Sequence, residues 1–219
     1  MQNFVYQPPS AEEGLVILHK DDDVLVLSKP AGLLSVPGKA VDHADCLESR
    51  VREAFPQARI VHRLDMATSG IMVLAMTAEA HRHLGLQFER RKTKKSYVAR
   101  IWGHPEKDKG TVDLPLICDW PNRPKQKVDF ENGKQAVTEW EIIKREEQES
   151  RVRLYPLTGR SHQLRVHMLS LGHPILGDDF YAPPEALSAA DRLQLHAESL
   201  SFHHPADGVV RSFTDPCPF

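Results

Sequence analysis

The chain has 219 residues, a length that fits one large domain or two small ones and that can bury a hydrophobic core. Hydrophobic residues make up 41% of the chain and charged residues 26%, a balance that excludes wholesale disorder. The formal net charge of −2, taken alone, argues against a nucleic-acid-binding protein, because such proteins are usually basic.

The N-terminal part of the chain predicts an arm followed by a β-hairpin. Residues 1–14, which contain Pro8 and Pro9, are expected to form a loose N-terminal arm. Apolar runs at 15–19 and 24–28 flank three consecutive aspartates, a pattern that is typical of two strands joined by a turn.

Two helices and a buried strand are predicted next. Asp45 is a suitable N-cap for a helix over residues 45–55, whose apolar residues share one face. Residues 71–76 have the pattern of a short buried strand. Thr77 can cap a second helix, which ends in the basic run 89–95.

The rest of the chain is predicted to be rich in strands. A third helix is expected over about residues 162–171, ended by Gly172. Strands are expected at residues 96–102, 136–143, 151–156 and 193–202. Because these strands follow one another without regular helical crossovers, we expect an α+β fold with a mixed, mainly antiparallel sheet and flanking helices.

Cysteine usage and the N-terminus bear on the cellular compartment. Three cysteines without a CxxC pair fit a reducing compartment better than a disulfide framework. The first residues lack the basic and apolar regions of a signal peptide, and no apolar run approaches the roughly 18 residues of a membrane span. We therefore expect a cytoplasmic protein.

Positive charge is concentrated in one part of the sequence. Residues 51–100 carry ten basic and four acidic side chains. The usual explanation is a solvated helix face, and cations at a helix C-terminus also suit its dipole. The alternative is a surface that meets phosphates. The candidate phosphate contacts are Arg90, Arg91, Lys94 and Lys95, with a second contact loop formed by Arg123, Lys125 and Lys127.

The first segment that could carry chemistry is 61–70. It places Asp65 two residues after Arg63, just ahead of a Thr-Ser-Gly turn and the buried strand. Spacing alone favours an aspartate that caps a turn through its own backbone.

The second segment is 158–167, at the start of the third helix. Arg160 precedes the helix, and Arg165 lies about one turn into it, where a cation opposes the helix dipole. A fixed anionic partner would explain Arg165. Helical spacing puts it one step from the face of Leu164 and near His162, so it could line a cleft. The alternative is a surface arginine that pairs with any nearby acid.

The third segment sets Tyr97 beside the basic run. An aromatic ring next to cations can stack on an unpaired base while the cations meet phosphates. The alternative for a lone tyrosine in a strand is core packing.

A metal site is not expected. The twelve histidines form no HExxH pattern, and no cysteine or carboxylate completes a known ligand spacing. The sequence also lacks a P-loop, a GxGxxG motif and a GxSxG motif. These absences argue, in turn, against ATP-driven chemistry, nicotinamide-dependent chemistry and hydrolysis by a serine on a nucleophile elbow.

Taken together and in order, the three segments resemble the motifs of the RluA family of pseudouridine synthases. The resemblance covers about residues 15–205 and includes Lys29-Pro30-Ala31-Gly32-Leu33 and Gly177-Asp178. The motif segments are His62-Arg63-Leu64-Asp65 with Thr68-Ser69-Gly70, Lys95-Ser96-Tyr97-Val98-Ala99, and Gly159-Arg160 with His162-Gln163-Leu164-Arg165-Val166-His167.

The resemblance implies the family fold, with a central catalytic cleft, and an isomerase that needs no cofactor. Asp65 is then the catalytic carboxylate, which adds covalently to sugar or base or removes a ribose proton; both routes stay open. Arg165 is implied to pair with Asp65 and keep it ionised. Tyr97 is implied to stack on the target uracil and to help remove its C5 proton. Arg63 is implied to fill the stack that the flipped nucleotide leaves, or else to pair with Asp65.

The same resemblance implies the substrate and the domain organisation. Residues 114–127 resemble the subgroup that modifies 23S rRNA and tRNA stem-loops. We expect a single catalytic domain over 15–219, without an S4-type RNA-binding domain, acting as a monomer with no obligate protein partner. Further substrate-binding candidates from the motifs are His62, Leu64, Thr68, Arg160, His162 and Leu164. The competing hypotheses are a non-catalytic RNA-binding module and a histidine-rich metal-dependent hydrolase.

Overall fold

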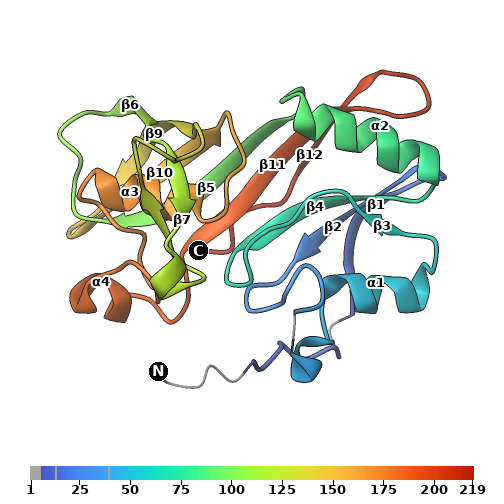
Figure 1. Cartoon of the computed structure of the whole chain (residues 1–219), viewed down its shortest axis with the longest axis horizontal. Coiled ribbons are helices and arrows are strands. Elements are labelled where there is room, and N and C mark those ends of the chain that lie inside the picture. Colours follow the sequence, from blue (N-terminus) through green and yellow to red (C-terminus); the bar gives the residue numbers. More distant parts are fainter. Residues whose placement is uncertain (1–5, 13, 39) are drawn as a thin grey trace. The chain divides into compact units, whose positions relative to one another are not determined.

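The computed structural model describes residues 6–12, 14–38 and 40–219 (Figure 1). The chain divides into two compact units, one formed by Met1–Lys94 with Ala197–Pro216 and the other by Lys95–His196 with Cys217–Phe219. The sequence pattern offers no signal for this division, and the single catalytic domain expected over 15–219 stays a prediction.

The first unit contains a sheet in which β1, β2, β4 and β11 lie in that order, with β3 beside β4 and β12 beside β11. The pairs β1–β2, β2–β4, β3–β4 and β11–β12 are antiparallel. Its elements are β1 (Val16–Lys20), β2 (Val24–Lys29), η1 (Val41–His43), α1 (Leu47–Ala54), β3 (Arg59–Ile60), β4 (Ser69–Ala75), α2 (Ala78–Glu89), β12 (Val210–Thr214) and most of β11 (Leu195–His203).

The predicted hairpin is confirmed as β1 and β2, and its turn has a local cause. The Oδ1 atom of Asp21 accepts hydrogen bonds from the backbone N–H groups of Asp23 and Val24, at 2.9 and 2.8 Å. An aspartate that bonds the backbone two residues ahead is a frequent turn-former. The predicted strand at 71–76 is confirmed as β4, which is buried along its whole length.

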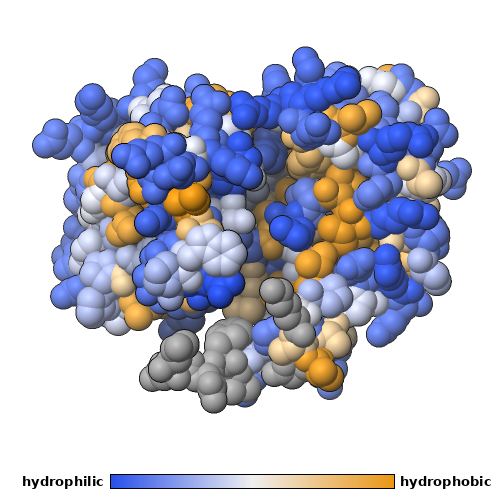
Figure 2. Space-filling model, viewed as in Figure 1, coloured by the Kyte–Doolittle hydropathy of each residue, from blue (hydrophilic) through white to orange (hydrophobic). Residues whose placement is uncertain are grey.

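Two helices flank the strands of this unit (Figure 1). Thr77 caps α2 as predicted, because its hydroxyl oxygen accepts the N–H of Ala80 at 3.0 Å. The prediction of Asp45 as the cap of α1 is wrong. Cys46 is the N-cap, and the Asp45 carboxylate instead accepts from the Arg50 guanidinium at 2.7 Å. Hydrophilic side chains cover much of the outer surface of α2, as expected for an amphipathic helix (Figure 2).

The expected N-terminal arm has no helix or strand over residues 6–12, but it is fixed in place. Tyr6 is buried, and its hydroxyl donates to the carbonyl of Asp45 at 2.9 Å and accepts the N–H of Leu34 at 3.0 Å. Residues 1–5 and 13 of the expected arm lie outside the described residues.

The second unit is built on the antiparallel strand order β5–β10–β9–β6, with β7 and β8 as a separate hairpin. Of these strands, the sequence pattern predicts β5, β9 and β10 but misses β6, β7 and β8. The elements are β5 (Lys94–Trp102), β6 (Lys109–Asp113), β7 (Leu116–Cys118), η2 (Trp120–Asn122), β8 (Gln126–Val128), β9 (Val137–Arg145), β10 (Glu149–Pro156), α3 (Gln163–Ser170) and α4 (Pro184–Ser188).

Helix α3 packs against β9 and β10, on one face of this sheet. The hydroxyl oxygen of Thr138 in β9 accepts a hydrogen bond from the side-chain amide of Gln163 in α3, at 3.0 Å. The same hydroxyl lies 2.9 Å from Nδ1 of His167. The register places Pro156 opposite Thr138 and Leu154 opposite both Trp140 and Tyr97. Because directly paired residues share a face, Tyr97 lies on the face that α3 covers. None of the helices within the described ranges is long and apolar enough to cross a membrane.

Candidate active site

Asp65 lies in an irregular segment of the first unit, between β3 and β4, and is partly exposed. Its carbonyl accepts the N–H of Thr68 at 3.1 Å, which makes the turn that leads into β4. The same segment is fixed from the other side by the loop after β2. Gly32 donates its N–H to the carbonyl of Met66 at 2.9 Å, and the Ser35 hydroxyl donates to the carbonyl of Leu64 at 2.7 Å. We call residues 64–66 the Asp65 loop.

The Asp65 loop also contacts Lys29, at the end of β2. The Lys29 side chain is fully buried, and its Nζ donates to the carbonyls of Pro30, Leu33 and Met66, at 2.8, 2.7 and 3.0 Å. An ammonium group has three protons, so it can donate one to each of these carbonyls. Lys29 therefore joins the loop after β2 to the Asp65 loop, a role that the sequence pattern did not reveal.

Replacing Lys29 with methionine should destabilise the protein by about 2–4 kcal/mol, because the change removes a fully buried ammonium group and leaves three carbonyls, including that of buried Leu33, without their donor. Urea unfolding of the purified variant measures the loss. Lys107→Met, which changes an exposed lysine, is the matched control and should shift the free energy of unfolding by less than about 0.5 kcal/mol. Equal stability of the two variants would contradict this account of Lys29.

The neighbours of Asp65 in the first motif differ in exposure. Leu64 and Thr68 are buried, whereas Arg63 is exposed. The Nε2 atom of His62 accepts the N–H of Val73 at 3.1 Å, and its ring stacks on Phe88 at a centroid distance of 4.4 Å. His62 thus ties this segment to β4 and α2. Its predicted contact with substrate, like those of Leu64 and Thr68, stays a prediction.

Arg165 lies in the first turn of α3 in the second unit and is 2% exposed. Its guanidinium donates through Nε to Oδ2 of Asp178 at 2.8 Å, and through Nη2 to Asp178 and, at 2.9 Å, to Asp179. A cation at this end of a helix opposes the dipole, and the two carboxylates offset that cost. The sequence argument for a fixed anionic partner is confirmed, but it did not find Asp178 or Asp179.

Asp178 and the aromatic residues beyond it build the surroundings of Arg165. The Asp178 carboxylate is 1% exposed and also accepts the N–H groups of Phe180 and Tyr181, at 3.0 and 3.2 Å. The Arg165 guanidinium lies 5.0 Å from the ring centre of Phe180 and 5.2 Å from that of Tyr181. His162 shares these partners, with Nδ1 2.7 Å from the Tyr181 hydroxyl.

The start of α3 is fixed by a buried polar network. The Gln163 amide donates to Val137 and Thr138, and its oxygen accepts the hydroxyl of Thr158 at 2.7 Å and the N–H of Arg160 at 3.0 Å. Gln163 and Thr158 are each 3% exposed. One glutamine thus orders both the loop that carries Arg160 and the helix that carries Arg165. Leu164 is buried, and its predicted contact with substrate stays a prediction.

His167 extends this network and makes it sensitive to acid. Its Nε2 is 3.1 Å from the carbonyl of Leu114, which can only accept, so Nε2 carries the proton and Nδ1 accepts the Thr138 hydroxyl. Burial lowers the pKa of His167 below its ordinary value of 6.5. The unfolded chain therefore binds this proton more readily than the folded chain.

Stability should consequently fall as the pH is lowered through 6.5 towards the folded-state pKa of His167, and the loss is absent above 6.5. The contribution of one proton has a slope of at most about 1.4 kcal/mol per pH unit. Urea unfolding between pH 8 and about pH 5 should show a shallower pH dependence in His167→Gln than in the unchanged protein. Identical slopes would contradict the assignment.

Lys95 and Tyr97 lie two residues apart on β5 and share the face that α3 covers. Both are half-buried, and burial lowers the pKa of Lys95. The other predicted phosphate contacts are mostly at the surface: Arg90, Arg91, Lys94, Arg123 and Lys127 are exposed, and Lys125 is partly exposed. Arg123 stacks on the exposed ring of Trp120 at 4.6 Å, and the Nζ of Lys125 lies 6.0 Å from the ring centre of Tyr181.

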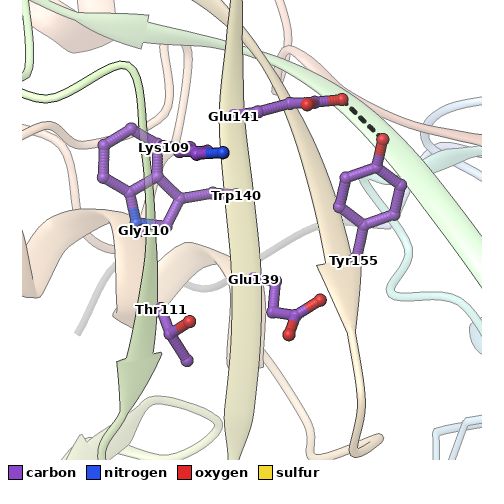
Figure 3. Close-up of a pocket in the computed structure, with 7 residues that line it drawn as sticks. All are labelled: Lys109, Gly110, Thr111, Glu139, Trp140, Glu141 and Tyr155. Atoms are coloured by element: carbon purple, nitrogen blue, oxygen red, sulfur yellow. Dashed lines mark hydrogen bonds between the residues drawn. The ribbon is translucent and has the colours of Figure 1, made fainter.

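An open cavity of about 460 Å³ lies elsewhere in the second unit, along β6, β9 and β10 (Figure 3). Its lining includes Glu141 and Tyr155, whose side chains meet in a hydrogen bond of 2.6 Å. Glu139, Glu141 and Tyr155 alternate with Thr138 and Trp140 in the register, so these three lie on the sheet face opposite α3. None of the predicted site residues lines this cavity.

The predicted site residues are thus divided between the units. Asp65 and Arg63 belong to the first unit, whereas Tyr97, Arg160 and Arg165 belong to the second. The pairing of Asp65 with Arg165 therefore stays a prediction. Among the described residues, no group of three or more His, Cys, Asp or Glu side chains could hold a metal ion.

Comparison with known proteins decides the class of chemistry. A model of the family described as RNA pseudouridylate synthase matches residues 23–170. The chain belongs to the RNA pseudouridylate synthase family. This pseudouridylate synthase isomerises uridine to pseudouridine in RNA, as the three motifs led us to expect. Neither the non-catalytic RNA-binding module nor the metal-dependent hydrolase is supported.

Individual relatives of this pseudouridylate synthase match it over nearly their whole length. It is 59% identical to the "Dual-specificity RNA pseudouridine synthase RluA" of Salmonella typhi and 58% identical to that of Escherichia coli K12, each over 98% of both chains. Among solved structures, it is similar to "Human RNA Pseudouridylate Synthase Domain Containing 1", at a TM-score of 0.81 and 30% identity, covering 97% of this chain and 87% of the other. The expected α+β fold is confirmed.

Proposed function

We propose that this synthase modifies uridines in two kinds of RNA, a loop of 23S rRNA and the anticodon stem-loop of tRNA. The observation that carries the proposal is the 58–59% identity, over 98% of both chains, to proteins whose name states a dual specificity for RNA. The enzyme is further inferred to act in the cytoplasm, as a monomer, without an obligate protein partner.

The reaction itself defines what the site must supply. The N1–C1′ bond of uridine breaks, the base turns, and C5 bonds to C1′. The proton on C5 is lost, and N1 gains one, so the atoms balance and no electrons are gained or lost overall. The chain must therefore hold the base during rotation, supply an ionised carboxylate near C1′ and move one proton.

Asp65 is the carboxylate that we assign to this task. It stands in a loop that Lys29, Gly32 and Ser35 hold by backbone contacts, which limits its freedom before substrate binds. We infer that Asp65 adds to the sugar or base, or removes a ribose proton, and that Arg165 keeps it ionised. Two carboxylates already hold the Arg165 guanidinium in one orientation.

Tyr97 and Arg63 are assigned to the nucleotide rather than to bond cleavage. Tyr97 stacks on the target uracil, and its hydroxyl helps to remove the C5 proton. Arg63 is exposed, so its planar guanidinium is available to fill the stack that the flipped nucleotide leaves. Flipping costs a few kcal/mol and costs less in a loop than in a duplex, which favours stem-loop substrates.

The substrate proposal is tested with purified enzyme and two synthetic stem-loops, one from 23S rRNA and one from the tRNA anticodon arm. Each carries tritium at C5 of uridine, so that C5–C1′ bond formation releases tritium to water. We expect release from both RNAs, and none from either RNA when the target uridine is replaced by cytidine. Release from only one of the two would overturn the dual specificity.

A further inference from the structure

Two cationic residues of the second unit neighbour Gly159, and no acidic side chain among the described residues pairs with either of them. The Nζ of Lys95 is 3.7 Å from the point where a Cβ on Gly159 would stand, so the amine lies against this backbone. Arg160 follows Gly159 in the chain, and its Nε donates to the carbonyl of Gln135 at 3.1 Å. Within the described ranges, neither Lys95 nor Arg160 forms an ion pair.

The surroundings of Lys95 are costly for a positive charge. The side chain is half-buried, and desolvation by burial lowers the pKa of its amine; no carboxylate in the described part of the chain offsets this effect. Partly buried cations are normally paired, as Arg100 is with Glu149 and Arg165 is with Asp178 in the same unit. Lys95 therefore differs from these two arginines, which have carboxylate partners. An anion from outside the chain would compensate the desolvation of its charged amine.

The two cations also have a defined position relative to the substrate residues. Lys95 precedes Tyr97 by two residues on the same strand, so both side chains lie on the sheet face that α3 covers. The backbone of Arg160 is fixed by Gln163 at the start of α3, the helix that carries Arg165. Lys95 thus shares a strand and a sheet face with Tyr97, the residue that we assign to the target uracil, and Arg160 lies at the start of the helix that covers this face.

We propose that Lys95 and Arg160 form a phosphate-binding site for the backbone of the target nucleotide. This inference rests on the proposed function and deepens it, because it assigns these two cations to one phosphate rather than to general attraction of RNA. A phosphate carries a full negative charge and compensates a desolvated ammonium, whereas a neutral uracil oxygen does not. Binding it would anchor the sugar of the target nucleotide while the base turns.

The test combines variants with an RNA that lacks one charge. Stem-loop RNAs carry an uncharged methylphosphonate in place of the phosphate on the 5′ side or the 3′ side of the target uridine. Single-turnover pseudouridine formation divided by the RNA dissociation constant is measured for the unchanged protein, Lys95→Met, Lys95→Arg and Lys94→Met. Lys94 is the exposed preceding residue on the opposite face of β5, and it serves as the comparison for general phosphate contact.

We expect Lys95→Met to lower this ratio about 10- to 100-fold on normal RNA. One of the two methylphosphonates should lower the ratio by a similar factor for the unchanged protein. The same methylphosphonate should lower the ratio little further for Lys95→Met, because both changes remove the same contact. Lys95→Arg should retain sensitivity to that methylphosphonate. Lys94 is not assigned to either of these phosphates. The fold-reduction caused by Lys94→Met and that caused by either methylphosphonate should therefore be independent and should multiply when the two are combined.

The outcomes separate the two claims. If the unchanged protein is active but the Lys95→Met and methylphosphonate effects multiply at both positions, the phosphate site is overturned and the proposed function stands. Wild-type rates for Lys95→Met would overturn the site in the same way. If the unchanged protein forms no pseudouridine in either stem-loop, the proposed function fails and this inference falls with it.

Discussion

Asp65→Asn is expected to reduce pseudouridine formation by at least about 1,000-fold while the RNA still binds. The substitution keeps the shape of the side chain but removes the charge, and an amide can neither add to C1′ nor accept a ribose proton as a carboxylate does. The backbone contacts that hold the Asp65 loop come from Lys29, Gly32 and Ser35 and involve no atom of the Asp65 side chain. Since asparagine also has nearly the shape of aspartate, we expect the variant to fold.

Tritium release from RNA labelled at C5 measures the rate, and a filter-binding titration of the same RNA measures the affinity. Asp22→Asn, which changes an exposed aspartate in the β1–β2 turn, is the matched control and should retain the rate. The assignment of Asp65 would be wrong if its asparagine variant worked within about tenfold of the unchanged protein.

The second large effect concerns Asp178. Asp178→Asn should destabilise the protein by about 3–5 kcal/mol, because it leaves the buried Arg165 guanidinium without its bidentate partner. Asp179→Asn is the matched comparison. Its carboxylate is 51% exposed and accepts from the same guanidinium, so its loss should cost less than about 1 kcal/mol.

Urea unfolding compares the two variants, and single-turnover kinetics tell whether Asp178 also positions Arg165 for the reaction. If it does, those Asp178→Asn molecules that remain folded should show a slower chemical step with an RNA affinity within about threefold of the unchanged protein. Equal stability losses in the two variants would mean that Asp178 holds Arg165 no more firmly than Asp179.

The sequence predicted those parts of the molecule that depend on local pattern. The hairpin of β1 and β2, the buried strand β4 and the Thr77 cap all follow from neighbouring residues, and they are confirmed. The short strands β6, β7 and β8 escaped prediction, because three to five residues carry too little alternation to be recognised.

The candidate site shows the same limit. The helix dipole favoured an anionic partner for Arg165, but spacing could not identify Asp178, because the chain between them turns back on itself after α3. Lys29 was part of a motif without a role, since its three acceptors include Met66, 37 residues away. A buried lysine in a strand offers no signal until its partners are known.

The central claim is that this chain forms pseudouridine in cellular RNA through Asp65. Pseudouridine mapping of 23S rRNA and tRNA, in cells that lack the gene and carry either the unchanged gene or Asp65→Asn, tests it most directly. One site in each RNA should disappear on deletion, return with the unchanged gene and stay absent with Asp65→Asn. Retention of every site on deletion, or their return with Asp65→Asn, would contradict it.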